Sequence, residues 1–115
     1  MSNSPLSATV EFQRDGIQHG FLKLPYSHDG SAWGHVMTPI TVVRNGDGPT
    51  ALLTGGNHGD EYEGMEAIHR TFEALDPSSM SGTFVAVPVV TLPAYWMACR
   101  VNPLDGRNMA RVFPG

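Results

Sequence analysis

His58 and Glu61 are the residues of this 115-residue chain whose types and spacing best suit chemistry. They stand three positions apart in a glycine-rich segment, residues 55–61, which reads Gly-Gly-Asn-His-Gly-Asp-Glu. In a turn that enters a helix, side chains at this spacing can converge on one point. A neutral imidazole and an ionised carboxylate suit Zn²⁺, because Mg²⁺ and Ca²⁺ prefer all-oxygen ligands. We therefore predict a zinc site that uses both residues.

A simpler interpretation of this pair stays open. His58 would hydrogen bond to a loop carbonyl, and Glu61 would only place negative charge near the start of a helix. A catalytic zinc takes three protein ligands and leaves a fourth position for water, whereas this pair supplies two ligands. The pattern His-x-x-Glu is common by chance, so the glycine-rich turn around it is what favours a metal.

A second group of polar residues follows near the C-terminal end. Arg107, Asn108 and Arg111 stand within five residues of one another in a turn-rich stretch. Guanidinium groups bind carboxylates through two parallel hydrogen bonds, so these three are candidate substrate-binding residues for an acylated amino acid. The alternative is that the arginines are surface charges or braces of the loop.

The elements that position these residues follow from hydrophobic spacing. An apolar run at residues 51–54 predicts a buried strand, and apolar side chains at steps of three and four predict a helix that starts near Asp60 and stops at Asp76-Pro77. Asp60 and Glu63 resemble a capping box. Residues 83–87 predict another buried strand, so a right-handed parallel crossover is expected, with the His58 turn at the carboxyl edge of the sheet.

The flanking segments are less regular. Residues 36–43 predict one extended segment interrupted at Pro39, and residues 45–48 predict a turn. Residues 93–97 predict a short helix with Pro93 in its first turn.

The other histidines do not extend the ligand pair. His69 falls eight residues after Glu61, about 12 Å along a helix at 1.5 Å per residue, so we expect a surface histidine. His19, His28 and His35 have no ligand-like spacing, and solvent-facing or loop-bonding roles are expected for them.

Composition limits the partners. The net charge of −4 and only seven Lys and Arg residues argue against nucleic acid or an anionic membrane. No apolar run approaches the ~20 residues needed to span a membrane, and the start lacks a secretion signal, so we expect a cytoplasmic protein. The length allows one domain.

Two motifs together resemble a known family. Residues 55–64, and then residues 108–115 (Asn-Met-Ala-Arg-Val-Phe-Pro-Gly), are similar in type and order to the metal motif and the Asn-Leu-Asn-Arg-x-Phe-Pro-Gly block of the succinylglutamate desuccinylase and aspartoacylase family, relatives of the zinc carboxypeptidases. Residues 20–27 and 31–34 resemble one branch of that family, which acts on an acetylated diamino acid. The similarity spans nearly the whole chain but only the first third or so of such an enzyme.

The resemblance implies a fold and a site. The fold is a three-layer α/β sandwich with a mixed, mainly parallel sheet, in which residues 1–44 form an amino-terminal strand-rich segment and residues 45–115 the first part of the catalytic domain. By this resemblance, Zn²⁺ would be bound by His58, Glu61 and a histidine that, like the general-base glutamate, is expected beyond Gly115. Arg111 would bind the substrate carboxylate, and Ala110 stands where the family usually has an asparagine before that arginine.

The implied activity is hydrolysis of the amide bond of a small N-acyl amino acid. A zinc carboxypeptidase is the alternative within enzymes. A fragment or binding module that keeps a weak metal or carboxylate site without turnover is the alternative outside them. The sequence leaves a homo-oligomer open.

Overall fold

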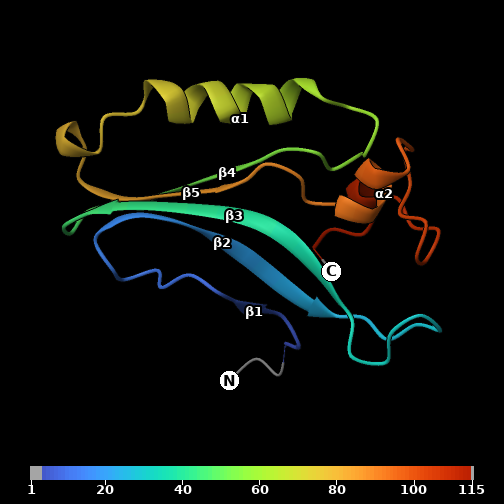
Figure 1. The fold of residues 1–115 in the computed structure, drawn as a ribbon. Helices are drawn as coiled ribbons and strands as arrows, with labels where there is room; N and C mark the ends of the chain where they lie inside the picture. Colours follow the sequence, from blue (N-terminus) through green and yellow to red (C-terminus); the bar gives the residue numbers. More distant parts are fainter. Residues whose placement is uncertain (1–3, 115) are drawn as a thin grey trace.

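The computed structural model describes residues 4–114, and its core is one five-stranded mixed sheet. The elements in chain order are β1 (Ser7–Ala8), β2 (Gly16–Pro25), β3 (His35–Asn45), β4 (Thr50–Thr54), α1 (Glu63–Ala74), the 3₁₀ helix η1 (Pro77–Ser79), β5 (Gly82–Val87), α2 (Leu92–Trp96) and the 3₁₀ helix η2 (Met109–Arg111). Figure 1 shows α1 lying along one face of the sheet and α2 near one end of it.

The sheet corrects one expectation about strand direction. Its strand order is β1-β2-β3-β5-β4. The pairs β1–β2, β2–β3 and β3–β5 are antiparallel, and β4–β5 is the parallel pair in residues 4–114. The mixed α/β class is therefore confirmed, but the prediction of a mainly parallel sheet is wrong for this part of the chain. The reason is the long β2–β3 hairpin, which contributes antiparallel pairs that need no crossover helix.

Pro39 does not interrupt its strand, contrary to the sequence expectation. β3 runs without a break from His35 to Asn45, and Pro39 pairs with Phe21 of β2. β5 pairs with β3 only from Thr41 onward, so Pro39 lies where β3 has one neighbour. A proline is tolerated there because one side of the strand needs no N–H donor.

The β4–α1–β5 unit agrees with the predicted order of strand, helix and strand, and β4 and β5 pair in parallel as expected. The prediction that residues 51–54 form a buried strand is wrong, because β4 lies at an edge of the sheet in residues 4–114 and its residues are exposed or half-buried. Ile68 of α1 is buried, and the ring of Phe72 packs edge-on against Phe84 of β5 at a centroid distance of 5.3 Å. This contact fixes α1 on its face of the sheet, because aromatic pairs prefer such edge-to-face packing.

The start of α1 differs from the prediction. The helix begins at Glu63 rather than near Asp60, and no side chain caps it. The predicted capping box of Asp60 and Glu63 is therefore wrong. The physical reason is a turn that comes first, in which the backbone N–H of Glu61 donates to the carbonyl of His58 at 3.4 Å.

The opposite face of the sheet carries a second core. Ile40 and Val42 of β3 pack with two valines of β5 and with Val10, which lies between β1 and β2 in the chain. Figure 1 shows the segment between β1 and β2 on the side of the sheet opposite α1. In residues 4–114 no long helix covers this face, so a third layer stays a prediction.

The predicted division at residues 44 and 45 falls inside β3, and segments from both sides of it share the sheet. Whether the two parts differ in role stays a prediction. Among the described residues, no helix is long and apolar enough to cross a membrane.

Candidate metal centre

The turn that carries His58 follows directly from the end of β4. The N–H of Gly55 donates to the carbonyl of Val87 at 3.0 Å, and the N–H groups of Val90 and Thr91 donate back to Gly55 and Gly56 at 2.9 and 3.1 Å. Gly56 has a φ of +60°, which residues with a side chain rarely adopt. The turn is therefore tied to the chain beyond β5 and held at the carboxyl edge of the β4–β5 pair.

Gly59 lets this turn lie directly against α2. A Cβ atom at Gly59 would stand 2.0 Å from the carbonyl carbon of Ala94 and 2.2 Å from its oxygen. Ala94 is itself completely buried. The position therefore needs a glycine because another part of the backbone fills the space that a side chain would occupy.

His58 contacts two oxygen atoms from different parts of the chain. Its Nδ1 lies 3.0 Å from Oε1 of Glu61, and its Nε2 lies 2.9 Å from Oδ1 of Asn108, which is 50 positions away. The imidazole is buried, with 7% of the residue exposed, whereas 55% of the Glu61 side chain is exposed. The structure thus brings the predicted ligand pair together, and one edge of the pair faces solvent.

The donor count at His58 favours a cation. An ionised carboxylate only accepts hydrogen bonds, and Oδ1 of Asn108 is an acceptor as well, because the N–H of Ala110 donates to it at 3.0 Å. A neutral imidazole has one N–H, so it can satisfy only one of these two oxygens. Either a second proton on His58 or a metal ion between Nδ1 and Glu61 resolves this mismatch. His58 and Glu61 therefore fit a bound divalent cation.

Glu61 also contacts Arg100, which the sequence analysis missed. The guanidinium Nη1 of Arg100 donates to Oε1 of Glu61 at 3.1 Å. The hydrogen bond with His58 lowers the pKa of the Glu61 carboxyl, desolvation opposes this, and the charge of His58 and then Arg100 lower it further. A lowered pKa favours the carboxylate form of Glu61, which is the form that binds a metal. No local pattern marks Arg100, since 39 residues separate it from Glu61.

A third ligand does not join this pair within the described part of the chain. Among residues 4–114, no group of three or more His, Cys, Asp or Glu side chains is placed to hold a metal ion. His69 lies on α1 with an exposed side chain, 3.6 Å from Glu73, as its predicted surface position requires. His28 and His35 are exposed as well.

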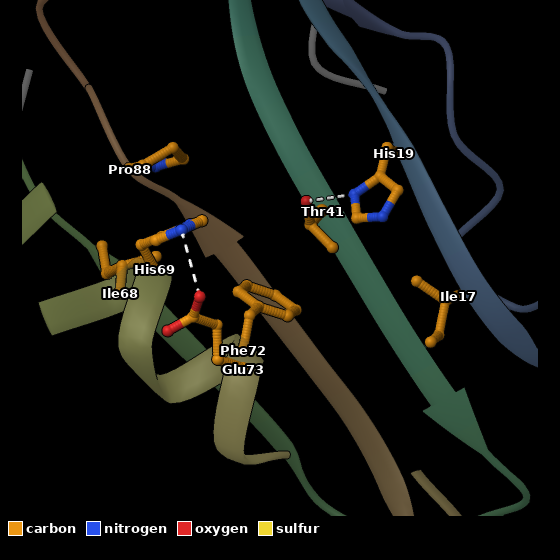
Figure 2. Close-up of a pocket in the computed structure, with 8 residues that line it drawn as sticks. All are labelled: Ile17, His19, Thr41, Ile68, His69, Phe72, Glu73 and Pro88. Carbon is orange, nitrogen blue, oxygen red and sulfur yellow. Dashed lines mark hydrogen bonds and ion pairs between the residues drawn. The ribbon is translucent and has the colours of Figure 1, made fainter. Parts of the chain in front are cut away.

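A separate pocket of about 430 Å³ lies between α1 and the sheet. Figure 2 shows His69 and Glu73 of α1 on one wall and His19 of β2 on the other, with Nδ1 of His19 bonded to the hydroxyl of Thr41 at 2.9 Å. None of the candidate metal ligands lines it. His19 is therefore not part of the candidate metal site, and its ring hydrogen bonds to the Thr41 side chain instead.

The predicted substrate-binding residues lie in different environments. Arg111 is exposed at the end of η2. Arg107 is exposed in a loop, where its carbonyl accepts from the N–H of Asn102 and its own N–H donates to the side chain of Asp105. Within residues 4–114 neither guanidinium forms an ion pair. Both arginines are therefore free to meet a carboxylate, which stays a prediction, whereas the side-chain oxygen of Asn108 is already bonded to His58 and Ala110.

Known proteins are similar to this chain in sequence and in fold. The chain is 56% identical over 112 residues to the N-alpha-acetyl-L-2,4-diaminobutyric acid deacetylase of Halomonas elongata. The aligned residues make up 97% of this chain and 33% of that protein. The product-bound structure of the ectoine utilization protein EutE (DoeB) from Ruegeria pomeroyi matches with a TM-score of 0.92 and 50% identity, over 100% of this chain and 35% of that one.

A succinylglutamate desuccinylase from a Silicibacter species matches with the same TM-score, identity and coverage. The chain thus spans about a third of the length of these relatives. Residues 47–115, which contain His58, Glu61 and Asn108, match the succinylglutamate desuccinylase/aspartoacylase catalytic domain. With more than half of the chain inside that match, this protein is a member of the succinylglutamate desuccinylase/aspartoacylase family.

Proposed function

We propose that the protein containing this chain is a zinc-dependent hydrolase that cleaves the amide bond of a small N-acyl amino acid. The observation that carries the proposal is the buried imidazole of His58, which faces two hydrogen-bond acceptors and has the ionised Glu61 beside it. A neutral imidazole has only one N–H for these two acceptors, and a divalent ion between Nδ1 and Glu61 would resolve the mismatch. The family supports the reaction class, because its members carry the names deacetylase and desuccinylase.

The residues of this chain would bind the metal and the substrate. His58 and Glu61 would hold Zn²⁺, which when bound polarises a carbonyl and lowers the pKa of a coordinated water. The guanidinium of Arg111 would bind the substrate carboxylate, and Arg107 stays an open candidate beside it. The resemblance implies that a third ligand, a histidine, and a general-base glutamate come from outside residues 1–115.

The substrate that we propose is N-acetyl-2,4-diaminobutyrate, with ectoine breakdown as its setting. The support is 56% identity to a deacetylase named for this substrate and the likeness to a product-bound ectoine utilization protein. Cytoplasmic location is part of the proposal, and so is a homo-oligomeric state, which the sequence left open.

The decisive experiment measures amide hydrolysis by a full-length protein that carries these 115 residues. N-acetyl-2,4-diaminobutyrate, N-acetylaspartate and N-succinylglutamate would be compared, with and without zinc. We expect zinc-dependent release of the free diamino acid to have the highest kcat/KM. A short peptide with a free C-terminal carboxylate would be assayed beside them, and faster zinc-dependent hydrolysis of its C-terminal peptide bond would support a zinc carboxypeptidase instead.

The two-ligand site in the described residues favours one other candidate, a metal- or carboxylate-binding module without turnover. Stoichiometric zinc binding together with no hydrolysis of any acylated amino acid would establish that alternative and overturn the enzyme proposal.

A further inference from the structure

We propose that Asn108 is a positioning residue for His58, which keeps the ring proton on Nε2 and turns Nδ1 toward the metal. This inference rests on the proposed zinc site and goes beyond it. It also assigns Asn108 a different role from the substrate contact that the sequence suggested. The side chain reaches His58 from the loop before η2, so the second motif supports a ligand in the first.

The orientation of the Asn108 amide is fixed by one backbone donor, the N–H of Ala110. Oδ1 accepts from the N–H of Ala110 at 3.0 Å, which caps η2, and the same oxygen lies 2.9 Å from Nε2 of His58. If the amide were rotated, its NH₂ group would face the N–H of Ala110, and two donors would oppose each other. The oxygen therefore faces His58, and Nε2 must carry a proton to donate to it.

This proton decides which nitrogen is free for the metal. With Nε2 protonated, the lone pair of the imidazole lies on Nδ1, which stands 3.0 Å from the Glu61 carboxylate. Metal-binding histidines usually donate their second N–H to an acceptor of this kind, which fixes the tautomer and the orientation of the ring. Because the His58 ring is buried, water offers little competition for that bond.

An amide at this position has a further consequence. A carboxylate acceptor strengthens donation from the ring more than a neutral amide does, and so makes Nδ1 a more basic ligand. Asn108 therefore orients His58 without adding a negative charge beneath the site. Asn108→Asp should keep the orientation and tighten zinc binding.

The first test compares zinc affinities of the full-length protein by competition with a fluorescent chelator. Asn108→Ser is the informative variant, because a hydroxyl can still cap Ala110 but is too short to reach His58. Asn102→Ser is the matched control, since the Asn102 oxygen caps Leu104 in the same way and does not contact His58. We expect Asn108→Ser and Asn108→Ala to weaken zinc binding by roughly 10- to 100-fold, and Asn102→Ser to leave it unchanged.

The second test identifies the protonated ring nitrogen by ¹⁵N NMR of the zinc-loaded protein with labelled histidine. We expect the proton on Nε2 of His58 in the wild type, with slow exchange that becomes fast in Asn108→Ser. A proton on Nδ1, or a zinc affinity that Asn108→Ser does not change, would overturn the inference and leave the proposed function standing. A wild type that retains no zinc in either test would overturn the proposed function, and the inference with it.

Discussion

At the residue scale, the site combines a buried ligand with an exposed one. His58 is held on both ring nitrogens, whereas Glu61 bonds to His58 and Arg100 on one side and is open to solvent on the other. This arrangement fixes the imidazole and leaves access for a substrate. The chemistry that we propose therefore depends most strongly on His58.

Replacing His58 should remove the zinc. His58→Ala deletes a ligand, so the full-length protein should lose its metal on dialysis, as measured by atomic absorption. His69→Ala is the control, because the side chain of His69 is exposed on α1 and lies 3.6 Å from Glu73. Equal zinc loss in both variants would show that the ligand assignment is wrong.

Arg111 should determine binding of the substrate carboxylate. Arg111→Ala removes a charge-assisted hydrogen bond, and we expect kcat/KM for an N-acyl amino acid to fall roughly 30-fold, which corresponds to about 2 kcal/mol. Ala110→Asn should improve substrate binding, because it restores the amide of the family motif. Unchanged kinetics for Arg111→Ala would assign this arginine to surface charge, and a loss in Ala110→Asn would mean that the site has compensated for Ala110.

At the element scale, two helical segments hold the turn in place. α1 follows the turn and packs on the sheet through Ile68 and Phe72. The backbone of α2 packs directly against Gly59. After α2, Ala98 has a φ of +48°, which is unusual for a residue with a side chain. Two residues later, Arg100 donates to Glu61.

The contact between the turn and α2 predicts a large effect of a small change. Gly59→Ala would place a methyl group inside the Ala94 peptide, so we expect a loss of about 3 kcal/mol in the free energy of unfolding, measured with urea. Gly64→Ala is the matched control, because Gly64 lies in α1 with its nearest contact at 3.5 Å. There we expect a gain of about 0.5–1 kcal/mol. Similar losses in both variants would refute the role of Gly59 in packing.

At the scale of the whole molecule, β4 is one of the two edge strands of the sheet. It pairs with β5 on one side, and within residues 4–114 no strand pairs with its other side. Leu52 in the middle of β4 is 66% exposed, which is unusual for a strand in a parallel pair. The described part of the chain thus presents unpaired backbone N–H and C=O groups and an exposed apolar side chain, Leu52, at this edge.

We expect this chain by itself to associate in solution. Leu52→Lys should shift it toward the monomer in sedimentation velocity, because a charge at an edge strand opposes strand pairing. Met97→Lys is the control, since Met97 is 67% exposed, about as much as Leu52, but follows α2 outside the sheet. A monomeric wild type, or equal effects of the two lysines, would contradict this prediction.

The same 115 residues should not be a competent enzyme. Two protein ligands hold zinc weakly, and if the general base comes from outside these residues, as we propose, its loss alone should lower the rate by roughly 10²- to 10⁴-fold. We expect no hydrolysis of N-acetyl-diaminobutyrate above background in a chromatographic assay. Zinc-dependent turnover by a purified monomer of this chain would mean that the described residues contain an unrecognised ligand and base.

Local patterns in the sequence by themselves determined β4, α1, β5 and the pairing of His58 with Glu61. These features depend on a short hydrophobic period or on a spacing of three residues, and such short-range geometry is the same in most folds. The start of α1 was mispredicted because the acidic residues after Asn57 suit both a helix cap and the turn that forms instead.

Only the tertiary structure decided the rest. The insertion of β5 between β3 and β4, the contact of Arg100 with Glu61 and the bond of Asn108 to His58 join residues that are far apart in the chain. Hydrogen bonds across such distances leave no period or local spacing in the sequence. They form because the packing of the whole sheet, α1 and α2 brings these segments to one edge, where a buried imidazole needs its partners.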